Sequence, residues 1–206
     1  MKILRLSNNY FEENCYIVVE NNACSIIDPG LNGEKIIEYL NTNNIILKNI
    51  FLTHGHIDHI GDIDMLNKKY PNCPIYLGEH DIPLLYDASL NVSKMSIKPK
   101  TYSEKLNVTP ILEKTTIDGY TFYPTPGHTK GSMIIEKGDF LFTGDTLFKG
   151  TVGRTDLPTG NISDLNESLS FISKSFSKDK KILPGHYDYS TLKEELKNNP
   201  YLRKKK

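Results

Sequence analysis

The feature that most constrains this chain is the segment HGHIDH at positions 54–59, which holds three of the six histidines in the sequence. Imidazole and carboxylate groups are the side chains that bind zinc and similar divalent ions. His54 and His56 lie two positions apart and can project to the same side of an extended segment, and Asp58 and His59 then follow in a turn into a helix. The segment therefore predicts a metal site, and it can present donors to two adjacent ions.

Four apolar runs share a second regularity, because each ends in glycine followed at once by a metal donor. The runs are FLTHGH, TFYPTPGH, FLFTGD and KILPGH, and the donors are His56, His128, Asp145 and His186. Glycine permits backbone angles and close approaches that other residues resist, which suits strand ends crowded around a shared centre. We expect these four strand ends to converge at one edge of the fold.

The complete donor set is too large for one four-coordinate ion and fits two ions that share a bridging carboxylate. Its members are His54, His56, Asp58, His59, His128, Asp145 and His186. An isolated histidine more often packs or hydrogen-bonds without binding a metal. We assign that structural role to His80, the one histidine outside the motifs.

Short apolar runs between turn residues predict strands, and segments with apolar residues three or four apart predict helices. Strands are predicted at 2–6, 15–20, 24–28, 48–53, 74–78, 120–124, 132–136, 140–144 and 181–185, and helices at 33–43, 59–70 and 162–176. We expect hairpins near the start and at 132–143, and mixed sheets with helices outside. The length of 206 residues predicts one domain over 1–206. Residues 86–110 have weak periodicity and two prolines, so we expect a long loop there, a candidate lid.

Composition restricts the partners. The 25 basic and 25 acidic residues cancel, which removes any overall field that would attract nucleic acid or an acidic membrane. No apolar run is long enough for a signal-peptide core or a membrane span. Cys15, Cys24 and Cys73 lack a paired spacing and fit free thiols. We therefore expect a cytoplasmic protein that acts on a small molecule.

Four motifs in this order resemble the metallo-β-lactamase superfamily. They are T-H-x-H-x-D-H-I-G from Thr53, P-G-H-T-x-G-S from Pro126, T-G-D-T-L-F from Thr143 and P-G-H from Pro184. The resemblance implies an α/β (α+β) fold, a four-layer αββα sandwich of two mixed β-sheets flanked by helices, with the metals at one edge. It implies a first metal held by His54, His56 and His128, a second held by Asp58, His59 and His186, and Asp145 as the bridge. Asp28, in D-P-G, resembles an aspartate that supports the metal loop from behind, and a plain Pro-Gly turn is the alternative.

The segment LFKGTVGRTDLP at 147–158 is similar to the glyoxalase II and persulfide dioxygenase branches. This similarity implies a hydrolase that cleaves thioesters with two divalent ions, zinc first, with iron or manganese as alternatives. In the expected mechanism a metal-bridging hydroxide attacks the carbonyl, and Asp58 orients it. Lys149 and Arg154 are candidate contacts for a substrate carboxylate, unless both are simply solvated on a loop. True β-lactamases, which generally lack the second-site histidine or carry cysteine in place of Asp145, and RNA-processing members, which usually have an added domain, are both disfavoured.

Three alternatives remain open: a persulfide dioxygenase that loads one iron on a subset of these ligands, a lactone or ester hydrolase, and a non-catalytic metal-binding protein. Full-length glyoxalase II enzymes carry a helical C-terminal extension that helps to bind glutathione, whereas only twenty residues follow His186. The chain is therefore closer to the compact glyoxalase II-like proteins, and its G-H-Y-D-Y-S-T also differs from the usual G-H-G-P-x-T. Either the loop at 86–110 or a partner subunit in a homodimer would then have to cover the pocket.

Overall fold

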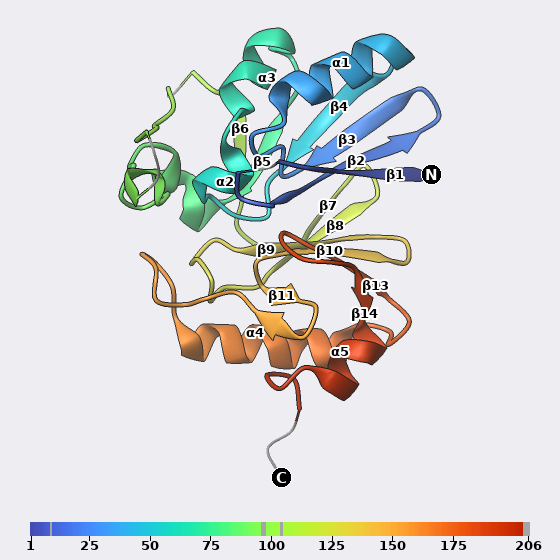
Figure 1. Cartoon of the computed structure of the whole chain (residues 1–206), viewed down its shortest axis with the longest axis vertical. Helices are drawn as coiled ribbons and strands as arrows, with labels where there is room; N and C mark the ends of the chain where they lie inside the picture. The colour runs from blue at the N-terminus through green and yellow to red at the C-terminus, as the bar shows by residue number, and fades with distance from the viewer. Residues whose placement is uncertain (9, 96–97, 104, 204–206) are drawn as a thin grey trace.

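The computed structural model describes residues 1–8, 10–95, 98–103 and 105–203, and it stacks two β-sheets between two layers of helices (Figure 1). The first sheet has the order β1-β2-β3-β4-β5-β6, with β1 (Lys2–Ser7), β2 (Asn14–Glu20), β3 (Ala23–Ile27), β4 (Ile46–Phe51), β5 (Ile75–Gly78) and β6 (Val108–Ile111). The second has the order β14-β13-β10-β9-β8-β7, with β7 (Thr115–Ile117), β8 (Tyr120–Pro124), β9 (Met133–Lys137), β10 (Phe140–Gly144), β13 (Lys181–Pro184) and β14 (Ser190–Thr191). A small hairpin joins β11 (Leu147–Phe148) to β12 (Thr151–Val152).

The helices lie on the outer faces of the two sheets (Figure 1). On the first sheet these are α1 (Gly33–Asn43) and α3 (Ile63–Lys69), and on the second α4 (Ile162–Ser175) and α5 (Leu192–Asn198). The short α2 (Ile57–Ile60) follows β4, and two 3₁₀ helices, η1 (Glu79–Leu85) and η2 (Ser93–Met95), follow β5. The predicted αββα sandwich is therefore confirmed.

Alternation along each strand explains the four layers, because successive side chains of a strand point to opposite faces. In β4, Ile50 packs in the core under the helices of the first sheet, whereas Phe51 packs between the sheets. In β10, Leu141 packs toward α4 and Phe142 packs between the sheets. Aromatic rings fill much of the middle core, where the centroids of Phe51 and Phe122 are 5.1 Å apart. Both faces of the inner strands are thus buried, which is why β2, β3, β9 and β10 read as near-continuous apolar runs.

The strand directions bring the predicted site to one edge. Strands β1, β2 and β3 pair antiparallel, as do β9 and β10, so both predicted hairpins are confirmed. Strands β3, β4, β5 and β6 then run parallel, and β10 pairs parallel with β13. The loops that follow β10 and β13 therefore emerge side by side, at the end where Asp145 and His186 stand.

The helix predicted at 59–70 is wrong as one element, because it forms two helices, α2 and α3. The backbone of Gly30 is inserted at the break: its amide donates to the carbonyl of His59 at 2.9 Å, and its carbonyl accepts from the amide of Asp62 at 2.8 Å. The Asp62 carboxylate also accepts from the amide of Gly33 at 3.0 Å. The carbonyl of His59 and the amide of Asp62, which would bond within a continuous helix, are therefore bonded to the backbone of Gly30 in an earlier turn of the chain.

The loop predicted at 86–110 is shorter than expected, since β6 begins at Val108. Pro110 hid this strand from the sequence pattern, but a proline is tolerated on an edge strand, and β6 lies at the edge of the first sheet. The loop is fastened to the metal loop, because the amide of Ile57 donates to the carbonyl of Asn91 at 3.0 Å and the hydroxyl of Tyr102 donates to the carbonyl of Ile60 at 2.8 Å. Positions 96, 97 and 104 lie outside the described residues, and the lid role stays a prediction.

The short elements β7, β11, β12, β14 and α5 also lacked a clear pattern in the sequence. The three cysteines are free, as predicted, and the structure buries all of them. Among the helices of the described residues, none combines the length and apolar character that a membrane crossing requires.

Candidate metal centre

The structure brings all seven predicted ligands together at one edge of the two sheets. Their donor atoms form three overlapping groups, within each of which the atoms lie within 4.8 Å of one another: His54, His56 and His128; His54, His59 and Asp145; Asp58, His59 and His186. His54 links the first group to the second, and His59 links the second to the third. The seven side chains therefore make one continuous cluster. Its first half is His54, His56 and His128, its second half is Asp58, His59 and His186, and Asp145 is the bridge between them that the family resemblance implies.

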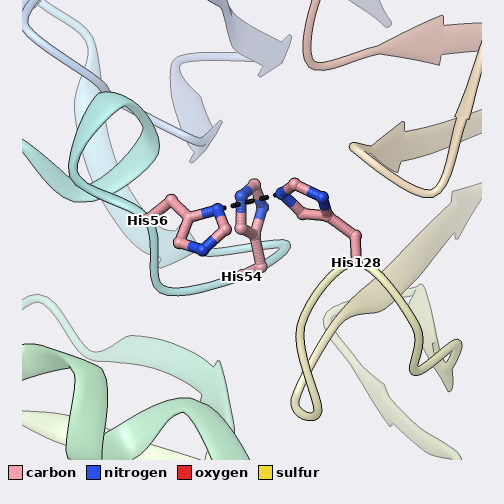
Figure 2. A group of neighbouring side chains, drawn as sticks. All are labelled: His54, His56 and His128. Carbon is pink, nitrogen blue, oxygen red and sulfur yellow. Dashed lines mark hydrogen bonds between the residues drawn. The ribbon is translucent and has the colours of Figure 1, made fainter. Parts of the chain in front are cut away.

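The first half contains three histidine rings that converge from two loops (Figure 2). His54 and His56 follow β4, and His128 follows β8. Nδ1 of His128 donates to the carbonyl of Arg154 at 2.8 Å, which leaves Nε2 with its lone pair facing the cluster. That Nε2 lies 2.9 Å from Nδ1 of His56.

Asp28 supports the second half from behind. Its carboxylate accepts from the amide of Thr53 at 2.7 Å and from the hydroxyl of Thr53 at 2.6 Å, and it lies 3.0 Å from Nδ1 of His59. A carboxylate on Nδ1 fixes the tautomer of a histidine and leaves Nε2 free for a metal. The same Thr53 hydroxyl lies 3.2 Å from Nδ1 of His54. The geometry thus agrees with the supporting role that the resemblance implies for Asp28.

At two positions the glycine before a donor provides the backbone angle or the close approach that the sequence predicted, because a side chain there would collide with its neighbours. Gly144 adopts φ +47°, and a side chain there would collide with Thr53. A side chain at Gly185 would collide with the carboxylate of Asp145 and come within 2.6 Å of Cε1 of His59. Both glycines let two loops meet at the centre of the cluster.

Several polar atoms of the cluster are buried without a hydrogen-bond partner among the described residues. They are Nε2 of His54, His56 and His59 and Oδ1 of Asp145. Buried polar atoms are nearly always paired, so a concentration of unpaired lone pairs at one place needs a ligand that accepts them. Divalent cations are such ligands, and the set of five imidazoles and two carboxylates has the chemistry that zinc, iron and manganese accept. The residues present therefore fit bound metal.

The two halves differ in protonation. Burial and the neighbouring histidines lower the pKa of His54 well below its usual value, and burial together with His128 lowers the pKa of His56 to about 3. These imidazoles are neutral at physiological pH, which is the form that binds a metal. No proton has to leave either ring before a cation enters the first half.

In the second half, imidazoles and carboxylates stabilise each other's charged forms. Burial opposes the charge on His59 and His186, but the carboxylates, Asp145 foremost, outweigh it and raise both pKa values. Burial likewise opposes the charge on Asp145, but His186 and His59 hold its pKa well below its usual range. Burial is also outweighed at Asp58, where His59 and a hydrogen bond from His186 lower the pKa. A cation entering this half would displace protons from the imidazoles.

Asp81 is a buried residue that the sequence analysis missed, and it joins the two loops of the first half. Its carboxylate accepts from the amide of Gly55 at 2.8 Å, from the amide of Gly131 at 2.7 Å and from the hydroxyl of Thr129 at 2.7 Å. Gly55 lies between His54 and His56, and Thr129 follows His128. The available signal was a fifth strand, PIYLG, that also runs into glycine and then an acidic segment, EHD.

Asn14 is a second missed residue, and it holds the His186 loop. Its side-chain amide donates to the carbonyl of Pro184 at 3.0 Å and to the carbonyl of Tyr187 at 2.8 Å, and its backbone amide donates to Gly185 at 2.7 Å. The neighbouring Glu13 is fully buried and forms a β-bridge with His186. No local pattern could have revealed these roles, because the partners are about 170 residues away in the chain.

The two residues predicted to contact substrate lie outside the cluster. Arg154 is exposed, and its guanidinium is paired with the carboxylate of Asp156 at 2.6 Å and 2.7 Å, so this pair would have to open before Arg154 could bind a substrate. Within the structure, Arg154 contributes through its backbone carbonyl, which accepts the hydrogen bond that orients the ring of His128. Lys149 is exposed, and the substrate role of both residues stays a prediction. His80 is exposed on η1 and belongs to none of the three groups of donor atoms, and the structural role assigned to it stays a prediction.

Comparisons with known proteins agree with this site. A family model described as "Metallo-beta-lactamase superfamily" matches residues 9–186. The probable metallo-hydrolase YqgX of Bacillus subtilis is 33% identical over 98% of each chain, and the hydroxyacylglutathione hydrolase GloC of Haemophilus influenzae is 31% identical over 95% of each. The solved structure of TTHA1623 in a di-iron-bound form has a TM-score of 0.88 and 32% identity, and the match covers 97% of this chain and 100% of that one.

Proposed function

The chain belongs to the metallo-beta-lactamase superfamily of metal-dependent hydrolases, and on this premise we propose that it hydrolyses a thioester with two divalent cations. One observation carries the proposal: seven donor side chains form a single cluster in which four buried atoms lack any other partner among the described residues. The similarity to GloC, a hydroxyacylglutathione hydrolase, supports a thioester as the substrate.

The proposed division of the residues between two cations is supported by the groups of neighbouring donor atoms. His54, His56 and His128 would hold one cation, Asp58, His59 and His186 would hold the other, and Asp145 would bridge them. When bound, the cations supply a hydroxide nucleophile at neutral pH and stabilise the negative charge that develops on the carbonyl oxygen. Zinc is the metal we propose, and the di-iron form of TTHA1623 supports iron as the alternative.

Asp58 is the proposed catalytic residue. Its Oδ2 lies 3.2 Å from Nε2 of His186, and the side chain is 18% exposed, so it faces both the cluster and solvent. A carboxylate in this place can accept a hydrogen bond from the attacking water and aim its lone pair at the carbonyl carbon. The leaving thiol needs no strong general acid, because thiols ionise with a pKa near 8.5.

The other side chains of the cluster act by holding these groups still. Asp28 and Thr53 fix the rings of His59 and His54 through their Nδ1 atoms. Asp81 and Asn14 fix the loops. The balanced charge of the chain and its three free cysteines support a small-molecule substrate and a reducing compartment such as the cytoplasm.

Metal analysis combined with two assays tests the proposal. The purified protein is expected to hold about two divalent ions per chain and to cleave S-lactoylglutathione without consuming oxygen. About one iron per chain, together with oxygen uptake on glutathione persulfide, would show a dioxygenase instead. Faster turnover of lactones or oxygen esters than of thioesters would move the substrate class, and bound metal without any turnover would leave a metal-binding protein.

A further inference from the structure

A largely apolar cavity of about 450 Å³ adjoins the loop that carries the first ligands of the cluster. Tyr10 and Phe11 line it from the loop between β1 and β2, Leu31 from the turn after β3, Ile57 from the metal loop, and residues 98–100 from the loop before β6. In the chain, Ile57 lies between His56 and Asp58, which belong to different halves of the cluster. The cavity therefore borders the segment that supplies ligands to both halves.

Phe11 connects this cavity to the second half of the cluster. The same residue also lines another cavity, whose wall includes His186. That second cavity is lined by charged residues, Arg5 and Asp188 among them. A thioester whose carbonyl group lies at the cluster would therefore adjoin one apolar cavity and one charged cavity.

The aromatic part of the wall is held in place without a ligand. The side-chain carbonyl of Asn8 accepts from the amide of Tyr10 at 3.1 Å and from the amide of Phe11 at 2.8 Å, and its side-chain amide donates to Glu13 at 3.2 Å. Asn8 and Glu13 are both buried. The two aromatic rings pack edge to face with centroids 5.2 Å apart, yet Tyr10 stays 56% exposed. An apolar surface that is fixed but open binds a ligand at a low cost in entropy.

Leu31 is fixed against the metal loop. It follows Gly30, whose amide donates to the carbonyl of His59 at 2.9 Å. A side chain at Gly61 would come within 2.5 Å of Cδ2 of Leu31, so the leucine lies directly against the backbone at the end of α2. Leu31 is nevertheless 38% exposed. Exposed apolar side chains that gather at one place commonly mark a binding site.

The charges around the cavity offer little to a polar or cationic group. Among the described residues that line it, none is acidic. The ammonium group of Lys100 is engaged, because it donates to the carbonyl of Gly61 and lies 2.8 Å from the carboxylate of Asp64. Lys98 is exposed, and its charge would repel a cation. An apolar group that leaves water for this cavity is stabilised in proportion to the area that it buries.

We propose that this cavity binds the acyl portion of the substrate, and that this portion is an apolar chain of several carbons and not a short hydroxyacyl group. The word substrate here rests on the proposed thioester hydrolysis. A carrier thiol such as glutathione is charged and suits the charged cavity beside His186, which leaves the apolar cavity to the acyl chain. Phe11 and Leu31 are the residues that select this chain.

Binding of the carboxylic acid products tests the inference apart from turnover. Calorimetric titration of the metal-loaded protein with hexanoate and with acetate compares two ligands that share a carboxylate and differ in their apolar chain. We expect hexanoate to bind roughly tenfold more tightly, or better, because each buried methylene adds to the affinity.

Two variants and a control locate the effect. Phe11→Ala and Leu31→Ala should each reduce the ratio of the two affinities by about threefold or more. Neither side chain belongs to the three apolar cores, so both variants should fold. Leu112→Ala shortens an exposed leucine that lies between β6 and β7 and outside the cavity, and it should leave the ratio unchanged.

Equal binding of hexanoate and acetate, no binding of either, or a ratio unchanged in both variants would overturn the inference. Hydrolysis of S-hexanoylglutathione and of S-lactoylglutathione is measured in parallel. A preserved binding ratio without hydrolysis of either compound supports the apolar site and refutes the proposed thioesterase activity. Hydrolysis combined with equal binding of the two acids supports the thioesterase and refutes the acyl site.

Discussion

Oδ1 of Asp145 lies 3.3 Å from Nε2 of His59, and neither buried atom makes a hydrogen bond with the described residues. The two atoms face each other within the cluster, as expected of ligands that share a cation once Nε2 has lost its proton. Asp145 also lies 3.5 Å from His128, so its carboxylate reaches both halves of the cluster.

Asp145→Ala is therefore expected to leave the protein folded and to lower thioester turnover by at least ~10²-fold. Folding should survive because Asp145 lies in a loop and not in any of the three apolar cores. Turnover and circular dichroism of the variant check both statements. Asp139→Ala, which removes an exposed carboxylate between β9 and β10, is the matched control, and unchanged turnover in Asp145→Ala would refute the bridging role.

Asp81→Ala should lower the free energy of unfolding by about 2–4 kcal/mol, because it leaves two buried backbone amides without an acceptor and also removes the bond from the Thr129 hydroxyl. It should also weaken the first metal, since the two loops that carry His54 and His128 lose their shared anchor. Urea denaturation and a competition titration with a chelating dye measure the two effects. Thr129→Val removes only one of the three bonds to Asp81 and should cause a smaller loss of stability and of metal affinity. Equal losses in the two variants would contradict the role of Asp81 as the shared anchor of the two loops.

Removal of the metals should destabilise the protein, because the unpaired atoms of the cluster lose their ligands. A ligand at a hundredfold excess over its dissociation constant contributes about 2.7 kcal/mol, which corresponds to a shift of roughly 5–10 °C in Tm for a chain of this size. Scanning calorimetry of loaded and chelator-treated protein measures the shift. The loss should reverse when the metal is restored, and identical Tm values would argue against a metal within this cluster.

The metal-free protein should lose stability as the pH falls below about 6.5, since His54 and His56 stay neutral in the folded state. Burial lowers both pKa values, that of His56 to about 3, whereas in the unfolded chain both rings take up protons near pH 6.5. Each histidine therefore reduces the free energy of unfolding by about 1.4 kcal/mol per pH unit in that window. The raised pKa values of His59 and His186 act in the opposite sense and mainly above this window, because the stability that they contribute is lost as the pH rises from about 6.5 toward their folded-state pKa values.

Urea denaturation between about pH 5 and pH 6.5 in the presence of a chelator measures this slope, above the range where most carboxylates titrate. His56→Ala should reduce the pH dependence of the free energy of unfolding by about 1.4 kcal/mol per pH unit, the contribution of one titrating proton. The same slope in the variant and the parent would show that His56 is protonated in the folded protein.

Many of the strands could be predicted from the sequence, since burial on both faces of a strand gives apolar runs such as CYIVVE and FLFTG. The helix at 33–43 was predicted with the bounds of α1, because its apolar spacing is a local property. The helix at 59–70 failed for the opposite reason. Its break depends on the backbone of Gly30, which a periodic pattern in the later segment does not record.

The sequence by itself determined the donor set and the convergence of the strand ends, because ligand chemistry and the glycine before each donor are written in adjacent residues. Only the tertiary structure decided how the donors are held and what surrounds them. Asp81 reaches Thr129 across 48 positions, and Asn14 reaches Tyr187 across 173. Contacts of this kind arise when separate loops are packed to one edge of two sheets, and no short segment of the chain contains both partners.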